Sequence, residues 1–445
     1  MPSAQMWFRR CLCAQIGCKL EIIVVGAGAA GLWVAERLAR RGRSVLLLEK
    51  TARAGTKILA SGGTRCNLTT TLGADDAAKL FGPAERFLQP ALRALPPAAV
   101  RERFHALGVP TVEEPALEKV FPASDRAVDV RDALLRAARS AGVVLRCNTE
   151  VRAVEPSGEG WTVATPGERI ACEKLVLCAG GASYPRTGCT GDGYGWLRAL
   201  DLPVVEPVPA LVPLRSSAAW VHTLSGVSIQ KTEARLLDAS GQTVARRARP
   251  VLFTHVGLSG PGAMDLSAMV ARGGAWTIAL DLLPHRADVD LQKSLVEAAG
   301  RPGGCRLIRA IGDGPPARLL AAAAHQAGIA EDNPALHQLD RSRRIRLVEA
   351  LKGLRVPISG VLSWDHAEVT AGGLALGEVD RRTFEVRRRP GLYVVGELLD
   401  LAGPIGGLNF QAAFSSAEAA ARHIGSCSTC TNRSSRRAYA APGPT

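Results

Sequence analysis

The chain has 445 residues, of which 47% are hydrophobic, and a formal net charge of +14. That length is enough for roughly two to four domains with cores of their own. No apolar run approaches the ~20 residues that span a bilayer. The eleven cysteines are odd in number and irregularly spaced, which argues against a disulfide scaffold. We therefore expect a cytoplasmic protein with reduced thiols and no membrane partner.

The two ends of the chain are expected to lie outside the folded part. Residues 1–19 contain Arg9 and Arg10 but no proper apolar core of a signal peptide, so we interpret them as a loose extension. Residues 425–445 are interpreted as a disordered tail. Cys427 and Cys430 form a C-x-x-C in this tail, but no second pair of ligands accompanies them. We expect no metal site.

Basic residues gather in short clusters along the chain. These clusters are dispersed, and only 4% of the residues are aromatic, so few side chains stand between the cations to stack on bases. Solvated helix faces and a basic tail explain the pattern best, and we expect a small-molecule substrate rather than a nucleic-acid partner. The clusters are Arg40–Arg43, Arg341–Arg346, Arg387–Arg389 and Arg433–Arg437.

The first predicted element is the apolar strand Ile22–Val25, which runs into a G-x-G-x-x-G turn. In such a turn Gly26 allows the tight reversal, Gly28 lets the backbone approach a pyrophosphate, and Gly31 lets the next helix pack close to the strand. The free N–H groups and the dipole of that helix then face the phosphates. The turn therefore predicts a dinucleotide site.

The elements after the turn support this prediction. A helix over Leu32–Arg41 stops at Gly42, and a second apolar strand, Val45–Leu48, follows it. Glu49 stands at the end of that strand, about 20 residues past the glycines, where an acidic group binds ribose hydroxyls. Glu49 also argues against a 2′-phosphate on the cofactor, because two anions would face each other.

The rest of the chain divides by composition. Residues 51–70 are rich in Gly, Ser and Thr and suit a loop around an anionic ligand. Residues 84–142 are expected to be helical, and a strand is expected over Thr149–Val154. Prolines crowd after residue 202 and mark a domain boundary. We expect a nucleotide-binding domain of residues 20–200 and 366–424, a β-rich substrate-side domain of residues 201–285 and 356–365, and a helical insertion of residues 286–355.

A second part of the ligand site is expected near the end of the nucleotide-binding domain. An apolar strand ends in Gly396 and Glu397, and the segment Gly403–Gln411 leads into a final helix. Together with the N-terminal turn, this pattern favours a two-part FAD site. The turn would bind the ADP half and Glu397 would meet the ribityl-pyrophosphate. The N-terminus of the final helix would point at the flavin edge that becomes negative on reduction.

The chain carries seven ordered motifs: Gly26–Gly31, Ser61–Asn67, Ala182–Pro185, Thr190–Gly193, Thr254–Pro261, Glu368–Gly373 and Gly396–Ala413. In these motifs the sequence resembles the BaiN-like flavoproteins, also called the aminoacetone oxidase family, and more distantly the fumarate reductase flavoproteins. The resemblance covers about residues 20 to 424. It implies an α/β fold in which a Rossmann-like FAD-binding domain of the two-dinucleotide-fold type carries inserted β-barrel-like and small helical domains.

The resemblance also implies which residues contact FAD, and they come from both ends of the FAD-binding domain. The expected contacts are Gly26, Gly28, Ala30, Gly31, Glu49, Lys50, Lys57, Gly62, Gly63, Arg65, Asn67, Val151, Ala179, Gly180, Glu397, Gly407 and Asn409.

Three residues are candidates for chemistry. His255, in the Thr-His motif, would exchange a proton beside flavin N5, although a structural histidine is the better interpretation. Thr370 corresponds to a flavin-facing glycine turn in the fumarate reductase-like proteins, and Tyr184 is a similar candidate for touching substrate. Cys66 is interpreted as a packing residue, because a redox pair needs a second cysteine and residues 68–72 hold none.

The implied reaction is hydride transfer between flavin N5 and a small organic substrate, and the sequence leaves its direction open. A reductase would use NAD(P)H as a transient co-substrate, because no second G-x-G-x-x-G follows a strand to form a nicotinamide domain. An amine oxidase would instead pass electrons to oxygen. Two alternatives from other classes are an RNA-associated flavoprotein that uses its +14 charge to hold tRNA, and a flavin-binding regulator without turnover.

Overall fold

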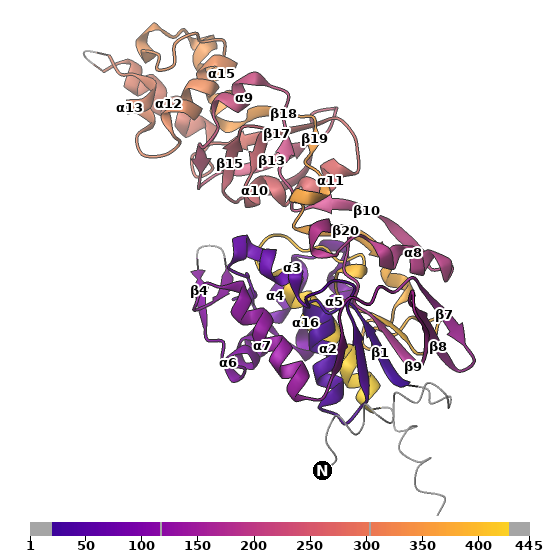
Figure 1. Cartoon of the computed structure of the whole chain (residues 1–445). Coiled ribbons are helices and arrows are strands. Elements are labelled where there is room, and N and C mark those ends of the chain that lie inside the picture. The colour runs from indigo at the N-terminus through magenta and orange to yellow at the C-terminus, as the bar shows by residue number, and fades with distance from the viewer. Residues whose placement is uncertain (1–19, 116–117, 302–303, 427–445) are drawn as a thin grey trace, which may run out of the picture. The chain divides into compact units, whose positions relative to one another are not determined.

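The structure is a computed structural model that describes residues 20–115, 118–301 and 304–426 (Figure 1). Residues 1–19, expected as an extension, and the tail with Cys427 and Cys430 lie outside the described residues. The described chain forms two compact units. The first holds residues 20–181, 187–206 and 372–426, and the second holds residues 182–186 and 207–371.

A seven-stranded sheet forms the centre of the first unit. Its order is β6-β2-β1-β9-β8-β7, with β21 paired to the C-terminal part of β9. In register, Val24 lies beside Leu47 on one side and Val176 on the other, and all three are buried. Continuous apolar strands of this kind are typical of parallel sheets covered on both faces. The strands are β1 (Leu20–Val25), β2 (Val45–Leu48), β6 (Val144–Arg146), β7 (Ala153–Ser157), β8 (Gly160–Ala164), β9 (Arg169–Leu177) and β21 (Leu392–Val394).

The parallel core of this sheet confirms the predicted Rossmann-like α/β fold. Strands β6, β2, β1, β9 and β21 run parallel, whereas β8 and β7 extend the sheet antiparallel. The further elements of this unit are α3 (Thr56–Ala60), β3 (Thr69–Thr70), α4 (Ala74–Lys79), α5 (Glu85–Ala94), α6 (Pro97–Ala106), β4 (Thr111–Glu114), β5 (Lys119–Pro122), α7 (Ala127–Ser140) and α8 (Asp192–Ala199).

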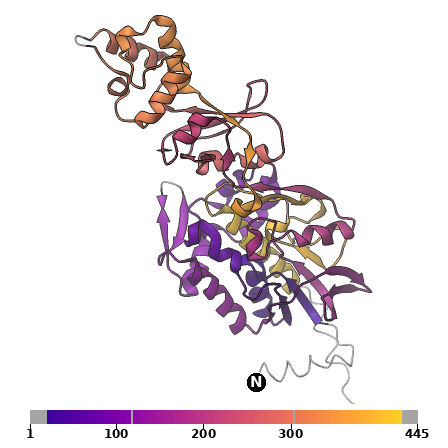
Figure 2. The same ribbon diagram turned by 45° about the horizontal axis from the view of Figure 1, so that its top comes forward.

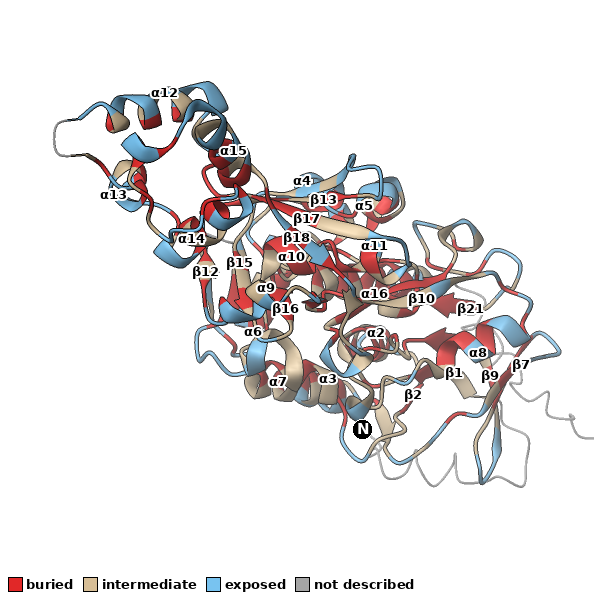
Figure 3. Cartoon of the chain, turned by 90° about the horizontal axis from the view of Figure 1, so that it is seen from above, coloured by how far each residue is buried: buried red, intermediate tan, exposed pale blue. Residues whose placement is uncertain are grey.

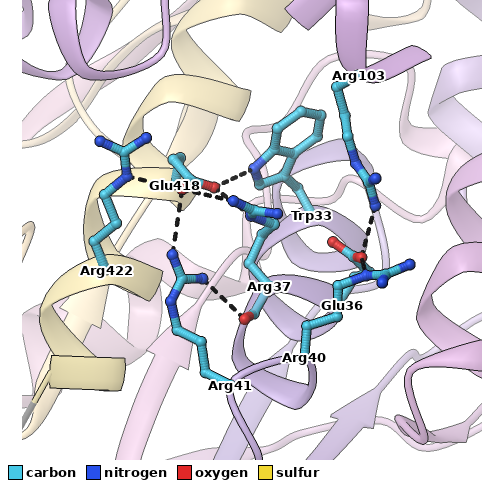
Figure 4. Close-up of polar contacts among 8 residues, drawn as sticks. All are labelled: Trp33, Glu36, Arg37, Arg40, Arg41, Arg103, Glu418 and Arg422. Carbon is cyan, nitrogen blue, oxygen red and sulfur yellow. Dashed lines mark hydrogen bonds and ion pairs between the residues drawn. The ribbon is translucent and has the colours of Figure 1, made fainter. Parts of the chain in front are cut away.

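Two helices from opposite ends of the sequence lie side by side against this sheet. They are α2 (Ala29–Ala39), indigo, and α16 (Leu408–Ser426), yellow, in Figures 1 and 2. The carboxylate of Glu418 on α16 is fully buried, and Arg37 Nε and Trp33 Nε1 on α2 donate to it at 2.7 and 3.2 Å (Figure 4). Arg422 also donates to it, at 2.8 Å. Burial alone would raise the pKa of Glu418, but these hydrogen bonds hold it below its usual value.

The prediction that residues 84–142 are wholly helical is wrong. Strands β4 and β5 pair antiparallel within that range and join β3 in a three-stranded sheet. Strand β5 buries Val120 and Phe121, but β4 has the sequence TVEE and stays largely exposed. A strand without an apolar face carries no alternation that a sequence pattern could reveal.

Two predicted boundaries also shift. Helix α2 starts at Ala29 rather than Leu32, because the Leu32 N–H already donates to the Gly28 carbonyl at 3.0 Å. The strand predicted over Thr149–Val154 lies later, in β7. The Thr149 N–H donates to the Glu49 carbonyl at 2.9 Å, which keeps this stretch as a loop beside the end of β2.

The second unit contains two antiparallel sheets, in the orders β12-β15-β16-β11-β19 and β14-β13-β17-β18, and a helical segment. The strands are β11 (Leu214–Arg215), β12 (Ser228–Ile229), β13 (Glu233–Leu237), β14 (Thr243–Arg247), β15 (Val251–Thr254), β16 (Gly257–Ser259), β17 (Trp276–Asp281), β18 (Leu354–Ile358) and β19 (Gly360–Val361). The helices are α9 (Ala219–Thr223), α10 (Pro261–Met264), α11 (Ser267–Ala271), α12 (Asp288–Ala299), α13 (Leu307–Ile311), α14 (Ala317–Gln326) and α15 (Arg341–Lys352).

The strands and the helical segment of the second unit share one buried core. Leu236 and Leu280 from the strands belong to the same hydrophobic cluster as Leu291, Leu320 and Leu351 from the helices. The shared core does not divide residues 286–355 from the strands of this unit, and their assignment to a separate helical insertion stays a prediction. The long segment of this unit begins within β10 (Val204–Ala210) and ends within β20 (Val369–Leu374). No helix among the described residues is long and apolar enough to cross a membrane.

Candidate functional site

The glycine-rich turn after β1 has two glycines that no other residue could replace without a collision. Gly26 has φ +97°, and a Cβ there would lie 2.5 Å from the Cys178 carbonyl oxygen. A Cβ on Gly31 would lie 1.8 Å from the Gly26 carbonyl oxygen. These close approaches hold the start of α2 against the ends of β1 and β9, as the fingerprint predicts.

Gly28 differs, because it faces open space. No heavy atom lies within 4 Å of a Cβ built on Gly28, which is the N-cap of α2. Within the described part of the chain no side chain caps this end, and the first turn holds no acidic residue. The first amides of an 11-residue helix are thus left for an anion, and a pyrophosphate fits that position.

The C-terminal part of the expected site meets the same helix end. Gly396 has φ +71°, and a Cβ there would lie 3.2 Å from the Ala30 Cβ in the first turn of α2. Glu397 follows directly and accepts a hydrogen bond from Lys57 Nζ at 2.6 Å. Residues 340 positions apart are therefore brought together at one end of the central sheet.

Glu49 is held in place by the turn itself. One carboxylate oxygen accepts from the Ala27 N–H at 2.9 Å, and the other accepts from the N–H and the hydroxyl of Thr51 at 2.9 and 2.7 Å. A carboxylate has about four acceptor positions, so one is left for a ribose hydroxyl. Thr51 was not anticipated from the sequence, because a hydroxyl two residues from a carboxylate is too common a pattern to signal a site.

The two lysines expected at FAD are both paired with carboxylates. Lys50 Nζ bonds to Asp192 and to the Thr190 hydroxyl, and Lys57 bonds to Glu397. Asp192 lies in the first turn of α8, where a negative charge is favourable. The T-G-D-G motif of residues 190–193 was visible in the sequence, but its pairing with Lys50 required the fold.

The loop between α3 and β3 is conformationally unusual. Gly62, Gly63, Thr64 and Cys66 all have φ between +56° and +73°, a region that non-glycine residues rarely adopt. Such runs cluster at ligand-binding sites. A Cβ on Gly63 would meet nothing within 4 Å, so the backbone is open on that side.

Asn67 joins this loop to the segment before α16. Its side-chain oxygen accepts from the Gly407 N–H at 2.9 Å, and its nitrogen donates to the Thr69 carbonyl at 3.1 Å. Gly407 has φ +79°, and a Cβ there would lie 2.2 Å from the same Thr69 oxygen. Asn409 bonds through both side-chain atoms to the backbone of Gly403, at 2.8 and 3.0 Å. The N-terminus of α16 is thereby fixed beside the loop.

Arg65 forms ion pairs at the surface, and Cys66 is buried in the core. The Arg65 guanidinium bonds to Asp125 and Glu114 at 2.5 and 2.7 Å and lies 4.0 Å above the Phe121 ring centre. Hydrogen bonds to Glu114 and Asp125 raise the pKa of Arg65. Cys66 is fully buried, and burial raises the pKa of its thiol to about 12, so it is neutral and poorly reactive.

The other expected FAD contacts lie at the ends of neighbouring strands. Ala179 and Gly180 follow β9, and Gly180 has φ +73° with Cys189 Sγ 3.4 Å from a Cβ built on it. Val151 is buried in the loop before β7. Contacts between FAD and these residues stay predictions.

The three candidates for chemistry belong to the second unit. Thr370 is fully buried, and its hydroxyl accepts from the Ala182 and Ser183 amides at 2.8 and 3.2 Å, a geometry that favours a positioning role. Tyr184 is half-buried with φ +52°, and its N–H donates to the Trp364 carbonyl at 3.1 Å. His255 is exposed in the turn between β15 and β16.

This arrangement fits a dinucleotide whose far end is a flavin. Open glycine backbone and the first amides of α2 suit the pyrophosphate, and a fixed carboxylate suits the adenosine ribose. The N-terminus of a 19-residue helix suits the flavin edge that gains negative charge. No group of three or more His, Cys, Asp or Glu side chains in the described part of the chain is arranged to hold a metal ion.

Comparison with known proteins gives one matching family model. The model of the HI0933-like protein Rossmann domain matches residues 20–423.

Three relatives match almost their whole length. The ribosomal RNA dihydrouridine synthase of Escherichia coli is 32% identical over 91% of this chain and 98% of its own. The 3-dehydro-bile acid delta(4,6)-reductase of Clostridium scindens is 29% identical over 90% of this chain and 98% of its own. The ribosomal RNA dihydrouridine synthase of Haemophilus influenzae is 29% identical over 91% of this chain and 98% of its own.

Proposed function

This chain belongs to the HI0933-like family of Rossmann-domain, FAD-dependent oxidoreductases, and on that premise we propose that it reduces a carbon–carbon double bond conjugated to a carbonyl group. The narrower resemblance to the BaiN-like or aminoacetone oxidase proteins is part of the same proposal. Its support is the 29% identity to the bile acid reductase.

The observation that carries this proposal is that the relatives' names describe the same type of reaction. A dihydrouridine synthase adds hydrogen across the C5–C6 bond of uracil, which is conjugated to the C4 carbonyl. A Δ4,6-reductase of a 3-dehydro bile acid acts on double bonds conjugated to the 3-oxo group. Both relatives align with about nine-tenths of this chain. A site that delivers a hydride to the carbon β to a carbonyl would serve either substrate.

The chain's own residues supply binding and orientation. Bound FAD, once reduced, supplies a hydride. The open backbone at Gly28 and the first amides of α2 hold the pyrophosphate, the Lys57–Glu397 pair fixes the junction of the two chain segments, and the N-terminus of α16 stabilises the reduced flavin edge. The substrate must also receive a proton at the carbon α to the carbonyl, and His255 and Tyr184 are the proposed donors.

We propose uridine in ribosomal RNA as the substrate and NAD(P)H as the electron donor. Two of the three relatives carry that activity in their names, and the net charge of +14 suits a polyanionic substrate. The dispersed basic clusters pointed away from nucleic acid on sequence grounds, so the substrate needs a direct test.

The test is an anaerobic titration of the purified, FAD-loaded chain. NADH or NADPH should bleach the flavin absorbance, and unmodified ribosomal RNA should restore it while nucleoside mass spectrometry detects one dihydrouridine per flavin reoxidised. If a 3-oxo-4,6-diene steroid restored the flavin absorbance and RNA did not, the substrate would be a steroid of the bile acid type instead of RNA. A flavin reduced by an amine and reoxidised only by oxygen would make the protein an oxidase and overturn the proposal.

A further inference from the structure

The helical segment of the second unit carries an open groove between α12 and α15. Figure 3 shows both helices with exposed, pale blue faces. The groove has a volume of about 400 Å³, and three of its lining residues are cations against a single carboxylate. It is lined by Val289, Gln292, Lys293, Val296, Glu297, Arg341 and Arg344.

Among the lining residues that the structure describes, the single carboxylate of Glu297 balances the three cations of this groove only in part. Lys293 and Arg341 are exposed, and no carboxylate of the described chain lies within ion-pair distance of either. The Arg344 guanidinium donates to the Leu339 carbonyl, which is uncharged. By contrast, Lys352 on the same helix is paired with Asp281 at 2.7 Å. The groove therefore presents positive charge to solvent.

The position of the arginines on α15 costs stability. Arg341, Arg343 and Arg344 occupy the first turn of this helix, which holds no acidic residue, so they lie at the positive end of the helix dipole. Asp340, the N-cap, offsets part of this by accepting from the Arg343 N–H at 2.8 Å. A bound anion would relieve the remaining repulsion, and a local arrangement that opposes stability is expected at functional sites.

The floor of the groove is aliphatic and open to solvent. Val289 and Val296 lie seven residues apart on one face of α12, and they are 76% and 49% exposed. Aliphatic side chains between separated cations suit an extended polyanion, whose sugars contact the apolar floor while its phosphates meet the cations.

We propose that the α12–α15 groove binds the sugar–phosphate backbone of RNA. This inference rests on the proposed reduction of uridine in ribosomal RNA and assigns a surface of the second unit that holds the RNA. Lys293 and Arg341 bind phosphates directly, and Arg344, held by the Leu339 carbonyl, adds a third, pre-oriented donor.

The test compares two double variants of the FAD-loaded chain. Lys293→Gln/Arg341→Gln removes two groove cations. Arg86→Gln/Arg382→Gln removes two exposed cations of the first unit, so its net charge equals that of the groove variant. Binding of a ribosomal RNA transcript is measured at several salt concentrations, together with flavin content and flavin reduction by NADPH.

The groove variant should bind RNA roughly tenfold more weakly, and the slope of log Kobs against log salt should fall by about 0.7–0.9 for each phosphate that the protein no longer neutralises. The control variant should keep the wild-type slope, and both should keep wild-type flavin content and reduction. Equally weakened binding by the two variants would overturn the groove assignment while dihydrouridine formation by the wild type still supported the function. A wild-type chain that binds no RNA at low salt would overturn the inference, and the titration above would then show which small molecule the flavin reduces.

Discussion

At the scale of single residues, the glycines of the turn after β1 have two different roles. Gly26 and Gly31 are required because backbone atoms lie where their Cβ atoms would stand. The fold itself does not require glycine at position 28, since no heavy atom lies within 4 Å of a Cβ there, and we expect only a bound ligand to require it. A substitution at Gly28 therefore separates ligand binding from folding.

Gly28→Asp should abolish flavin retention without unfolding the chain, because it places a carboxylate against the pyrophosphate. Gly73→Asp is the matched control, since Gly73 is also a helix N-cap with open space around its Cβ position. The measurement is flavin absorbance per chain after purification, with the thermal transition as a check on folding. A yellow Gly28→Asp protein would contradict the placement of the pyrophosphate.

At the scale of elements, the close approach of α2 to β1 sets the geometry of the site. A Cβ on Gly31 would lie 1.8 Å from backbone oxygen, so the helix would have to move away from the strand. Moving α2 would also move the amides that we propose face the cofactor. Sequence patterning predicted this approach because the fingerprint spaces its third glycine one turn into the helix.

Gly31→Ala should destabilise the FAD-free protein by about 3 kcal/mol, the upper range for forcing atoms into a packed site. For a unit of this size that lowers the Tm by about 6–12 °C. Gly195→Ala, at an exposed position of α8 with nothing within 4 Å, should leave the Tm unchanged or raise it slightly. Equal Tm values for the two variants would show that α2 is free to shift.

At the scale of the whole molecule, the first unit is assembled from segments far apart in the sequence. The hydrogen bonds of Trp33 and Arg37 to Glu418 join its first segment to its last (Figure 4). The Lys57–Glu397 pair joins the same two segments. Glu418 is fully buried among arginines that are only partly buried. We therefore expect its charge to stabilise the junction.

Glu418→Gln should lower the free energy of unfolding by about 3 kcal/mol near pH 7, because partly buried guanidinium groups lose their fully buried, charged partner. The folded-state pKa of Glu418 is depressed, so the stability it contributes is present above its unfolded pKa and is lost as the pH falls through the folded value. The wild type and the variant should therefore converge in acid.

Urea unfolding of both proteins across this pH range measures the convergence. Glu102→Gln, which alters an exposed carboxylate, should track the wild type at every pH. A constant difference between Glu418→Gln and the wild type down to acid pH would mean that the substitution acts through packing rather than charge.

The sequence by itself determined the glycine-rich turn after the first strand, the acidic residue after the second strand and the return of the chain at Gly396. These depend on local rules: backbone strain selects glycine, and strand and helix periods select apolar positions. Only the tertiary structure decided the partners of the charged side chains. Lys50 and Lys57 were expected at FAD, but the fold pairs them with Asp192 and Glu397.

The contrast between local sequence patterns and tertiary contacts also explains two other features that the sequence did not predict. Strand β4 has no apolar face, so its place was set by its hydrogen bonds to β5 rather than by any pattern of its own. Arg341 belonged to one basic cluster among several, and only the packing of α15 beside α12 placed it in a groove with Lys293, where no carboxylate of the described chain pairs with it. Ion pairs and strand pairing join residues distant in sequence, so they depend on the distances that folding creates.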